Sequence, residues 1–339
     1  MATQTVDKSA PGDSAHTPIS RGPREWALAL VRSRLFFGGV LLAALVAFFA
    51  IKLPGTFLAS SNLKSVLEQQ MTLVVLALGV TVVLMIGEFD LSFAATMALA
   101  GAVAVLMMTD HGWSALTAGA LAVVLGLVVG SINGVVVAYG RAPAFIATLA
   151  AGSALTGIEQ LLTSNKTIAE GIPIGYLDFT LVPHLGLPLS AWTGLLLVVV
   201  VAVVLAFTTY GRKVRATGLN ATATALAGIS VGKVRVSAFA ALGALAGLAG
   251  VIVTSQAGSY FPGSGAGLLL PPYSAVFLGA AIVGRGRFSP LASVYGLAFI
   301  ALLERGLTML DEPAALIQLI EGAVLLSAVL LARREKAAG

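Results

Sequence analysis

Apolar segments of about twenty residues recur along most of the chain, and this repetition limits what it can fold into. A helix needs about 20 apolar residues to cross a hydrocarbon core about 30 Å thick. By that measure the sequence predicts about ten membrane-spanning helices, so we expect an all-α, polytopic membrane helix bundle. The spans are expected at residues 35–53, 66–86, 91–109, 113–139, 143–163, 190–208, 236–256, 268–284, 288–304 and 313–332.

The composition supports a membrane protein and excludes several kinds of chemistry. Hydrophobic residues make up 58% of the 339 positions and charged residues 10%, whereas about a quarter of a soluble domain is charged. The net charge of +5 does not indicate nucleic acid binding, because the charges lie at the ends of apolar runs. The absence of cysteine excludes disulfides and thiolate metal sites. His16, His111 and His184 have no metal-ligand spacing, so neither a metal nor a cofactor is predicted.

Lysine and arginine are unevenly divided between the two sides of the predicted bundle. If the N-terminus is cytoplasmic, all but four of the 20 Lys and Arg residues fall inside, which the positive-inside rule favours. We therefore expect both termini in the cytoplasm. The predicted organisation is a disordered tail (1–34), a single transmembrane domain (35–333) and a short C-terminal tail (334–339). The four exterior cations are Lys52, Lys64, Lys166 and Arg305.

The order of the spans allows an inverted repeat. Spans two to five begin outside and spans seven to ten begin inside, with span six between the two blocks. Each block also holds an apolar stretch broken by a small polar loop, at 84–101 and at 277–296. The identity between these stretches is negligible, so the repeat is inferred from topology alone. The two long exterior segments, 164–190 and 258–271, are rich in Gly and Pro and are expected to be ordered loops or re-entrant pieces.

A basic segment at 209–235 separates two of the apolar runs and carries a short helix signal. Asn220 is a good N-cap, Ala221 to Leu226 favours a helix, and Gly228 suits the left-handed position that ends one. An isolated helix this short is marginal in water, so it must lean on its own membrane domain or on a partner subunit. We interpret the segment as a cytoplasmic docking element.

Several polar side chains fall within apolar surroundings, where they either contact a transported ligand or bond a neighbouring helix. Asp90, with Ser92, is best explained as capping the third span, and a substrate or proton role is the alternative. Glu88 is expected at the aqueous boundary, and Glu321 is an intramembrane carboxylate whose partner is not evident. The candidate translocation path consists of Asp90, Ser92, Asn133, Phe145, Thr148, Gln160 and Gln256, although packing also explains Phe145.

Four segments carry a resemblance to known proteins: GEFDLSFAATMALAGAVAV, NGVVVAYGRAPAFIATLAAGSALTGI, YGRKVRATGLNATATALAGISVGKVR and LGAAIVGRGRFSPLASVYGL. In this order, over about residues 66–332, they are similar to segments of the permeases of sugar-importing ABC transporters. The chain departs from the family pattern at Glu88-Phe89, just before Asp90, and at Arg287-Phe288. These departures leave the substrate and the local loop conformations open.

The resemblance implies the permease subunit of a bacterial ribose, xylose, arabinose or galactose type importer, which moves a pentose or hexose across the inner membrane by alternating access. It also implies four partners: ATP-hydrolysing subunits, an extracytoplasmic sugar-binding protein, a second permease subunit that forms a homodimer with the first, and the membrane lipid. No GxxxxGK[ST] loop occurs, so the chain is not expected to be an enzyme or to have catalytic residues. The expected ATPase-coupling residues are Gly218, Asn220, Ala223, Ala227, Gly228 and Ile229.

Two alternatives remain open on the sequence. One is an ABC permease for branched-chain amino acids or nucleosides with the same general fold. The other, from a different class, is a secondary transporter or channel that works alone, whose signature would be intramembrane charge pairs or an ion site.

Overall fold

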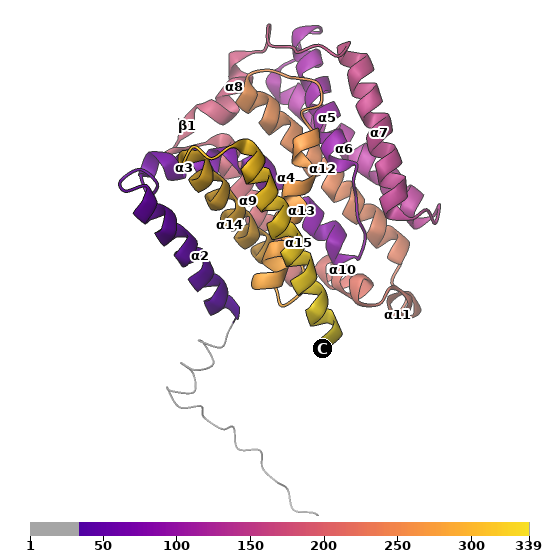
Figure 1. Ribbon diagram of the computed structural model, residues 1–339. Coiled ribbons are helices and arrows are strands. Elements are labelled where there is room, and N and C mark those ends of the chain that lie inside the picture. Colours follow the sequence, from indigo (N-terminus) through magenta and orange to yellow (C-terminus); the bar gives the residue numbers. More distant parts are fainter. Residues whose placement is uncertain (1–33, 339) are drawn as a thin grey trace, which may run out of the picture.

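Helices account for nearly all of the regular structure in the computed structural model, which describes residues 34–338 (Figure 1). The predicted tail at 1–34 therefore lies outside the described residues, except for its last position. A small hairpin, β1 (Pro183–His184) and β2 (Leu187–Pro188), accompanies the helices. In chain order the helices are α2 (Arg34–Lys52), α3 (Ser60–Gln69), α4 (Met71–Met85), α5 (Phe93–Thr109), α6 (Ala115–Ala138), α7 (Ala144–Thr163), α8 (Ile174–Leu181), α9 (Leu189–Phe207), α10 (Thr209–Leu219), α11 (Ala221–Leu226), α12 (Val231–Ala257), the 3-10 turn η1 (Ala266–Leu268), α13 (Leu270–Ile282), α14 (Pro290–Met309) and α15 (Ala314–Ala338).

Ten helical elements correspond to the ten predicted spans. Within the described residues, α6, α7, α9, α12 and α14 are long and apolar enough to cross a membrane, and α2, α5, α13 and α15 are shorter apolar helices. The second span differs from the prediction, because it is a pair of helices, α3 and α4, bent by 47° near Gln70. Residues that cap helices set several boundaries: Ser114 accepts from the backbone N of Thr117, and Ser289 from that of Ala292.

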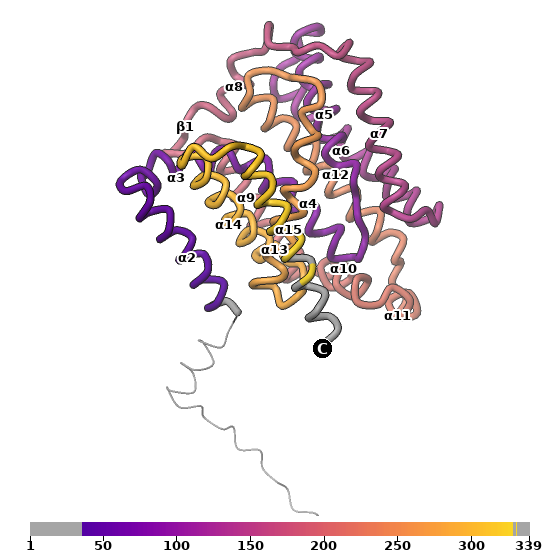
Figure 2. Tube along the Cα trace, viewed as in Figure 1, coloured from indigo at the N-terminus to yellow at the C-terminus, as the bar shows by residue number. Residues whose placement is uncertain are grey.

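The short helices α5 and α13 each follow a stretch of non-helical chain. Residues 86–92 connect α4 to α5, and residues 258–269, which include η1, connect α12 to α13. The two helices begin side by side, where Tyr273 of α13 donates a hydrogen bond of 2.7 Å from Oη to the carbonyl oxygen of Asp90. From this point they run toward opposite ends of the bundle (Figures 1 and 2). The two blocks thus have opposite directions, as the predicted inverted repeat requires.

The longest helix, α12, lies at the centre of the bundle and packs against α6 with their backbones in contact. A Cβ atom added to Gly126 of α6 would overlap the carbonyl oxygen of Gly243 on α12, and one added to Gly243 would overlap that of Gly126. Gly130 approaches the carbonyl oxygen of Phe239 in the same way. Small residues allow the two backbones to approach this closely, and such close packing helps to hold helices together in a membrane.

The predicted exterior segment 164–190 is ordered and covers one end of the bundle. It contains α8 and the β-hairpin, neither of which was predicted as an element. Ile168 pairs with Tyr260 in an antiparallel bridge, with both backbone hydrogen bonds at 2.9 Å. The side chain of Tyr176, on α8, is buried and its Oη lies 2.6 Å from Thr254 Oγ1 on α12. The two segments that were predicted to be exterior are therefore joined to each other and to the core.

Candidate functional site

Asp90 lies where the non-helical segment 86–92 meets α5, and only 1% of its surface is exposed. Its Oδ1 accepts hydrogen bonds from the backbone N of Ser92 at 2.7 Å and from Ser92 Oγ at 2.5 Å. The first N–H groups of a helix lack partners within the helix and carry its positive dipole end, so a carboxylate here stabilises the start of α5. The geometry agrees with the capping explanation of Asp90.

Two neighbouring helices bond the same short segment. On α6, Asn133 Nδ2 donates to Ser92 Oγ at 2.7 Å, and on α7, Thr148 Oγ1 accepts from the backbone N of Leu91 at 2.9 Å. Both side chains are buried. Four of the residues predicted for the path therefore meet at one place, where they hold the backbone of segment 86–92 in position. These are Asp90, Ser92, Asn133 and Thr148.

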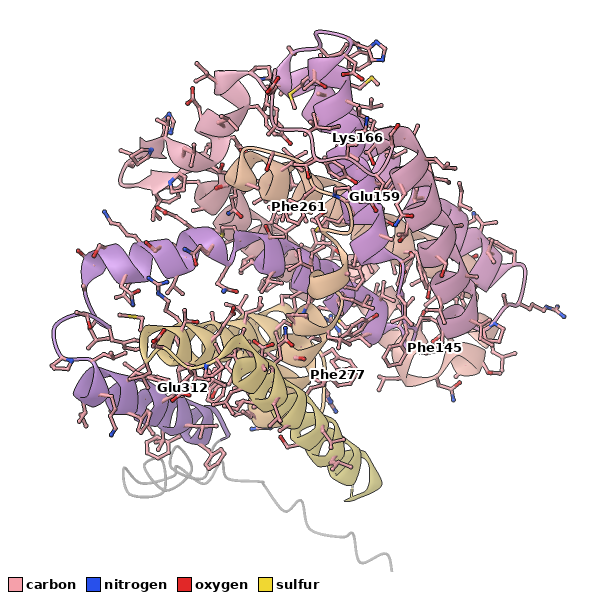
Figure 3. All side chains as sticks on the ribbon, turned by 45° about the horizontal axis from the view of Figure 1, so that its top comes forward. Phe145, Glu159, Lys166, Phe261, Phe277 and Glu312 are labelled. Carbon is pink, nitrogen blue, oxygen red and sulfur yellow. The ribbon has the colours of Figure 1, made fainter. Side chains whose placement is uncertain are left out.

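The other three residues predicted for the path lie elsewhere. Phe145 is 55% exposed on the outer side of α7, as Figure 3 shows, and Gln160 is exposed on the same helix. Gln256 donates a 2.7 Å hydrogen bond from Nε2 to the carbonyl oxygen of Glu68, and so connects α12 to α3. Gln256 was expected to contact either a ligand or another helix, and in the structure it contacts another helix.

A cavity of about 230 Å³ adjoins this junction, between α5, α7 and the segment that leads into α13. Its polar group of greatest interest is Glu159, on α7, which is 1% exposed. Glu159 Oε1 accepts from Tyr260 Oη at 2.5 Å and from the backbone N of Gly263 at 3.2 Å. The cavity is lined by Leu91, Ala94, Ala95, Ala98, Leu149, Gly152, Ser153, Thr156, Glu159, Gly263, Gly265, Ala266 and Leu269.

The basic segment forms two short helices at the other end of the bundle, the end at which α2 begins (Figure 1). The predicted helix is present as α11: Asn220 Oδ1 accepts from the backbone N of Ala223 at 2.9 Å, and Gly228 follows with φ of +81°. Leu226 is 86% exposed, so α11 presents an apolar side chain to the outside. The preceding helix, α10, was not predicted, and Thr208 caps it by accepting from the backbone N of Gly211.

The basic segment directly contacts the end of α4 and the non-helical segment 86–92 that follows it. A Cβ atom on Gly218 would overlap the carbonyl oxygen of Met85, so α10 lies against the end of α4. Arg235, in the first turns of α12, forms an ion pair of 2.9 Å with Glu88. Burial raises the pKa of the Glu88 carboxyl, and the guanidinium of Arg235 opposes that rise. The segment that carries Asp90 is thus joined, through Glu88, to the first turns of α12.

The family described as the permease component of the branched-chain amino acid transport system matches residues 62–329. The chain belongs to this family of ABC importer permeases. The permease is 32% identical over 311 residues to the ribose import permease of Haemophilus influenzae, covering 89% of its own length and 93% of the relative. It is 32% identical over 302 residues to the ribose import permease of Escherichia coli K12, covering 87% and 93% of the two chains. It is also 32% identical over 299 residues to the autoinducer 2 import system permease of Salmonella choleraesuis, covering 88% and 86%. No solved structure matches the permease.

Sequence reasoning missed Glu159, Tyr260 and Tyr273, although one signal for Glu159 was present. A carboxylate within an apolar span is a candidate functional residue, and the sequence placed Glu159 in the fifth span beside Gln160. Tyr260 and Tyr273 had no comparable signal, because their contacts are made across the two repeats. Glu321 proves to line a second cavity, of about 340 Å³, together with Glu304, Thr308 and Gln318 among others.

Proposed function

We propose that the permease moves a monosaccharide, a pentose or a hexose, through the membrane by alternating access. The observation that carries this proposal is the similarity, over nearly the full length, to permeases whose names specify ribose and autoinducer 2. The description of the family names branched-chain amino acids, but these individual relatives favour a sugar-like substrate.

The chemistry of the cavity also favours a neutral sugar over an amino acid. Small side chains line most of it, and its polar groups include two hydroxyls and the carboxylate of Glu159. An amino acid would bring an ammonium group, which Glu159 would attract, and also a carboxylate, for which the residues that line the cavity include no Lys or Arg. A sugar offers only hydroxyl groups, which donate to carboxylates and need no cationic partner.

We infer that α11 is the helix that couples the permease to an ATP-hydrolysing subunit, with Gly218, Asn220, Ala223, Ala227, Gly228 and Ile229 as the contact and hinge residues. The exposure of Leu226 supports docking, because a partner surface would cover it. Two contacts provide a route from α11 into the membrane. They are Gly218 against Met85, and Arg235 with Glu88.

The arrangement of cations supports a cytoplasmic position for α10, α11 and both termini. The start of α2 and the end of α15 lie at the same end of the bundle as α10 and α11 (Figure 1). Basic residues concentrate in these inside segments, as the positive-inside rule requires. They include Arg141, Arg212, Lys213, Arg215, Lys233, Arg235, Arg285 and Arg287. The complete importer that we propose contains two copies of the permease in the lipid of the inner membrane, ATPase subunits below it and an extracytoplasmic sugar-binding protein above it.

The test is ATP-dependent uptake by the complete importer in proteoliposomes. Radiolabelled ribose, xylose, arabinose, galactose and leucine are offered in turn, and we expect uptake of a sugar that requires both ATP and the binding protein. Uptake of leucine alone, or uptake by the permease without ATPase subunits, would overturn the proposal.

A single substitution tests the coupling role of α11. Ala223→Arg places a bulky charge on the exposed helix, so we expect it to abolish stimulated ATP hydrolysis and uptake while the permease remains folded. Ala142→Arg adds the same charge to another inside loop and serves as the control. Normal uptake by the Ala223→Arg importer would contradict the docking role.

A further inference from the structure

The carboxylate of Glu159 is a buried group that the capping and coupling contacts do not use. It is 1% exposed within a membrane span and lines the cavity between α5 and α7. A carboxylate in such a place is unfavourable unless hydrogen-bond donors surround it. Figure 3 shows Glu159 on α7, beside the segment that carries Phe261.

The structure supplies only part of the donor set that this carboxylate can accept. Among the described residues, the hydrogen bonds from Tyr260 Oη, at 2.5 Å, and from the backbone N of Gly263, at 3.2 Å, both end on Oε1. An ionised carboxylate has about four acceptor positions on its two oxygens. Oε2 is therefore available to a ligand in the cavity that Glu159 lines.

Two further polar side chains of the cavity also belong to α7. Ser153, Thr156 and Glu159 follow one another at intervals of three residues, so each neighbours the next along a stripe that winds around α7, and all three line the cavity. Ser153 Oγ donates to the carbonyl oxygen of Leu149 at 3.2 Å, and Thr156 Oγ1 donates to that of Gly152 at 3.0 Å. Because both hydroxyl protons are used within the helix, the two oxygens can only accept from a ligand.

This stripe therefore consists of acceptors without donors, and it suits a molecule that carries several hydroxyl donors. Opposite the stripe, the wall consists of small apolar side chains that leave room for a ring and impose no charge. A hydroxyl group that donates to an ionised carboxylate makes a stronger hydrogen bond than it makes to a neutral acceptor. Among the three groups, Glu159 is thus the one that most affects which ligand binds.

We propose that Ser153, Thr156 and Glu159 form an acceptor stripe that binds the hydroxyl groups of the transported sugar, and that Glu159 determines specificity for polyols. This inference rests on the proposed sugar import. Glu159 also ties the segment around Tyr260 to α7, and that segment is paired through the Ile168 bridge with the other exterior segment. A purely structural role must therefore be distinguished from ligand binding.

Two substitutions separate these roles in the complete importer reconstituted in proteoliposomes. Glu159→Gln keeps an oxygen acceptor for Tyr260 and Gly263 but removes the charge and places donors at the other position. Tyr260→Phe removes the hydroxyl that ties the segment to α7 but leaves the carboxylate intact. Gln160→Ala, at the adjacent exposed position, is the matched control. Each variant is first checked for its thermal transition in detergent.

Uptake of labelled ribose, xylose, arabinose and galactose is measured at saturating binding protein, together with ATP hydrolysis. We expect Glu159→Gln to reduce sugar uptake by about tenfold, the effect of losing one charge-assisted hydrogen bond, while stimulated ATP hydrolysis persists. Tyr260→Phe is expected to change uptake by less than about threefold, the effect of one neutral hydrogen bond, and Gln160→Ala to leave it unchanged.

Wild-type uptake by Glu159→Gln would overturn the inference. A parallel loss of uptake and ATP hydrolysis in both Glu159→Gln and Tyr260→Phe would do the same, because it would assign Glu159 a structural role only. Uptake of leucine that depends on Glu159 would replace the polyol with an ammonium ligand. Failure of the wild-type importer to take up any sugar would instead reject the proposed function, and the two failures are therefore distinguishable.

Discussion

Replacing Asp90 with alanine removes the carboxylate that holds the start of α5 inside the bundle. Two donors then lose their acceptor: the backbone N of Ser92, now 2.7 Å from Oδ1, and the Ser92 hydroxyl, now 2.5 Å from it. The hydroxyl can rotate to another acceptor and still receives the hydrogen bond of Asn133. The backbone N–H cannot rotate, so its loss dominates.

The magnitude follows from these contacts. Leaving a buried donor without a partner costs about 1–3 kcal/mol, and losing a favourable charge at a helix N-terminus costs about 0.3–1 kcal/mol more. Removal of a buried charge offsets part of this loss, because the folded protein no longer desolvates a carboxylate. We therefore expect Asp90→Ala to lower the free energy of unfolding by about 2 kcal/mol. Asp90→Asn keeps an acceptor at the same place and is expected to cost less than about 1 kcal/mol.

The measurement is unfolding of the purified permease in mixed detergent and SDS micelles, followed by tryptophan fluorescence. Uptake by the reconstituted importer is recorded for the same variants. If Asp90→Ala unfolds like the wild type but transports nothing, Asp90 acts on the substrate and the capping explanation is wrong. If Asp90→Asn is as unstable as Asp90→Ala, the charge matters more than the hydrogen bonds.

Three further substitutions test other contacts. Gly243→Val introduces a Cβ that overlaps the backbone of Gly126, so we expect it to destabilise the permease by about 3 kcal/mol in the same unfolding assay. An unchanged midpoint would contradict the close packing of α6 and α12. Reversing either charge of the Glu88 and Arg235 pair should weaken stimulation of ATP hydrolysis by the binding protein, and reversing both should restore it; additive losses would show that the pair transmits nothing. Asn220→Ala removes the cap of α11, at a cost of about 1 kcal/mol, and should weaken binding of the ATPase subunit about fivefold, whereas Asn220→Ser should retain it.

The positions of the spans could be predicted because apolar length and capping residues determine them locally. The same reasoning predicted α11 to the residue, since Asn220 and Gly228 mark its two ends. It did not predict α10, whose basic residues and internal glycines obscure the helical pattern, or the bend between α3 and α4. Charged residues give α3 a polar character that differs from the apolar α4 that follows, so the expected span at 66–86 included α4 and only the last turn of α3.

The site was less predictable because it depends on rotation and on contacts between distant segments. Successive residues of a helix point about 100° apart, so choosing Gln160 instead of Glu159 selects an exposed side of α7 in place of a buried one. Nothing within the span itself fixes that rotation. The partners of Glu159 come from the segment before α13, roughly a hundred residues later, and they meet α7 only when both blocks have folded together.

The length of α12 has a mechanical consequence. Its 27 residues run from the base that holds Arg235 to the segment that begins at Gly258 and leads to Tyr260, a distance of about 40 Å at about 1.5 Å per residue. Interlocked glycines make it one rigid rod with α6. A tilt of about 5° at the end that carries Arg235 therefore displaces the other end sideways by about 3.5 Å. That displacement exceeds the length of the hydrogen bond between Tyr260 and Glu159, so a small tilt of α12 is enough to separate the segment around Tyr260 from α7.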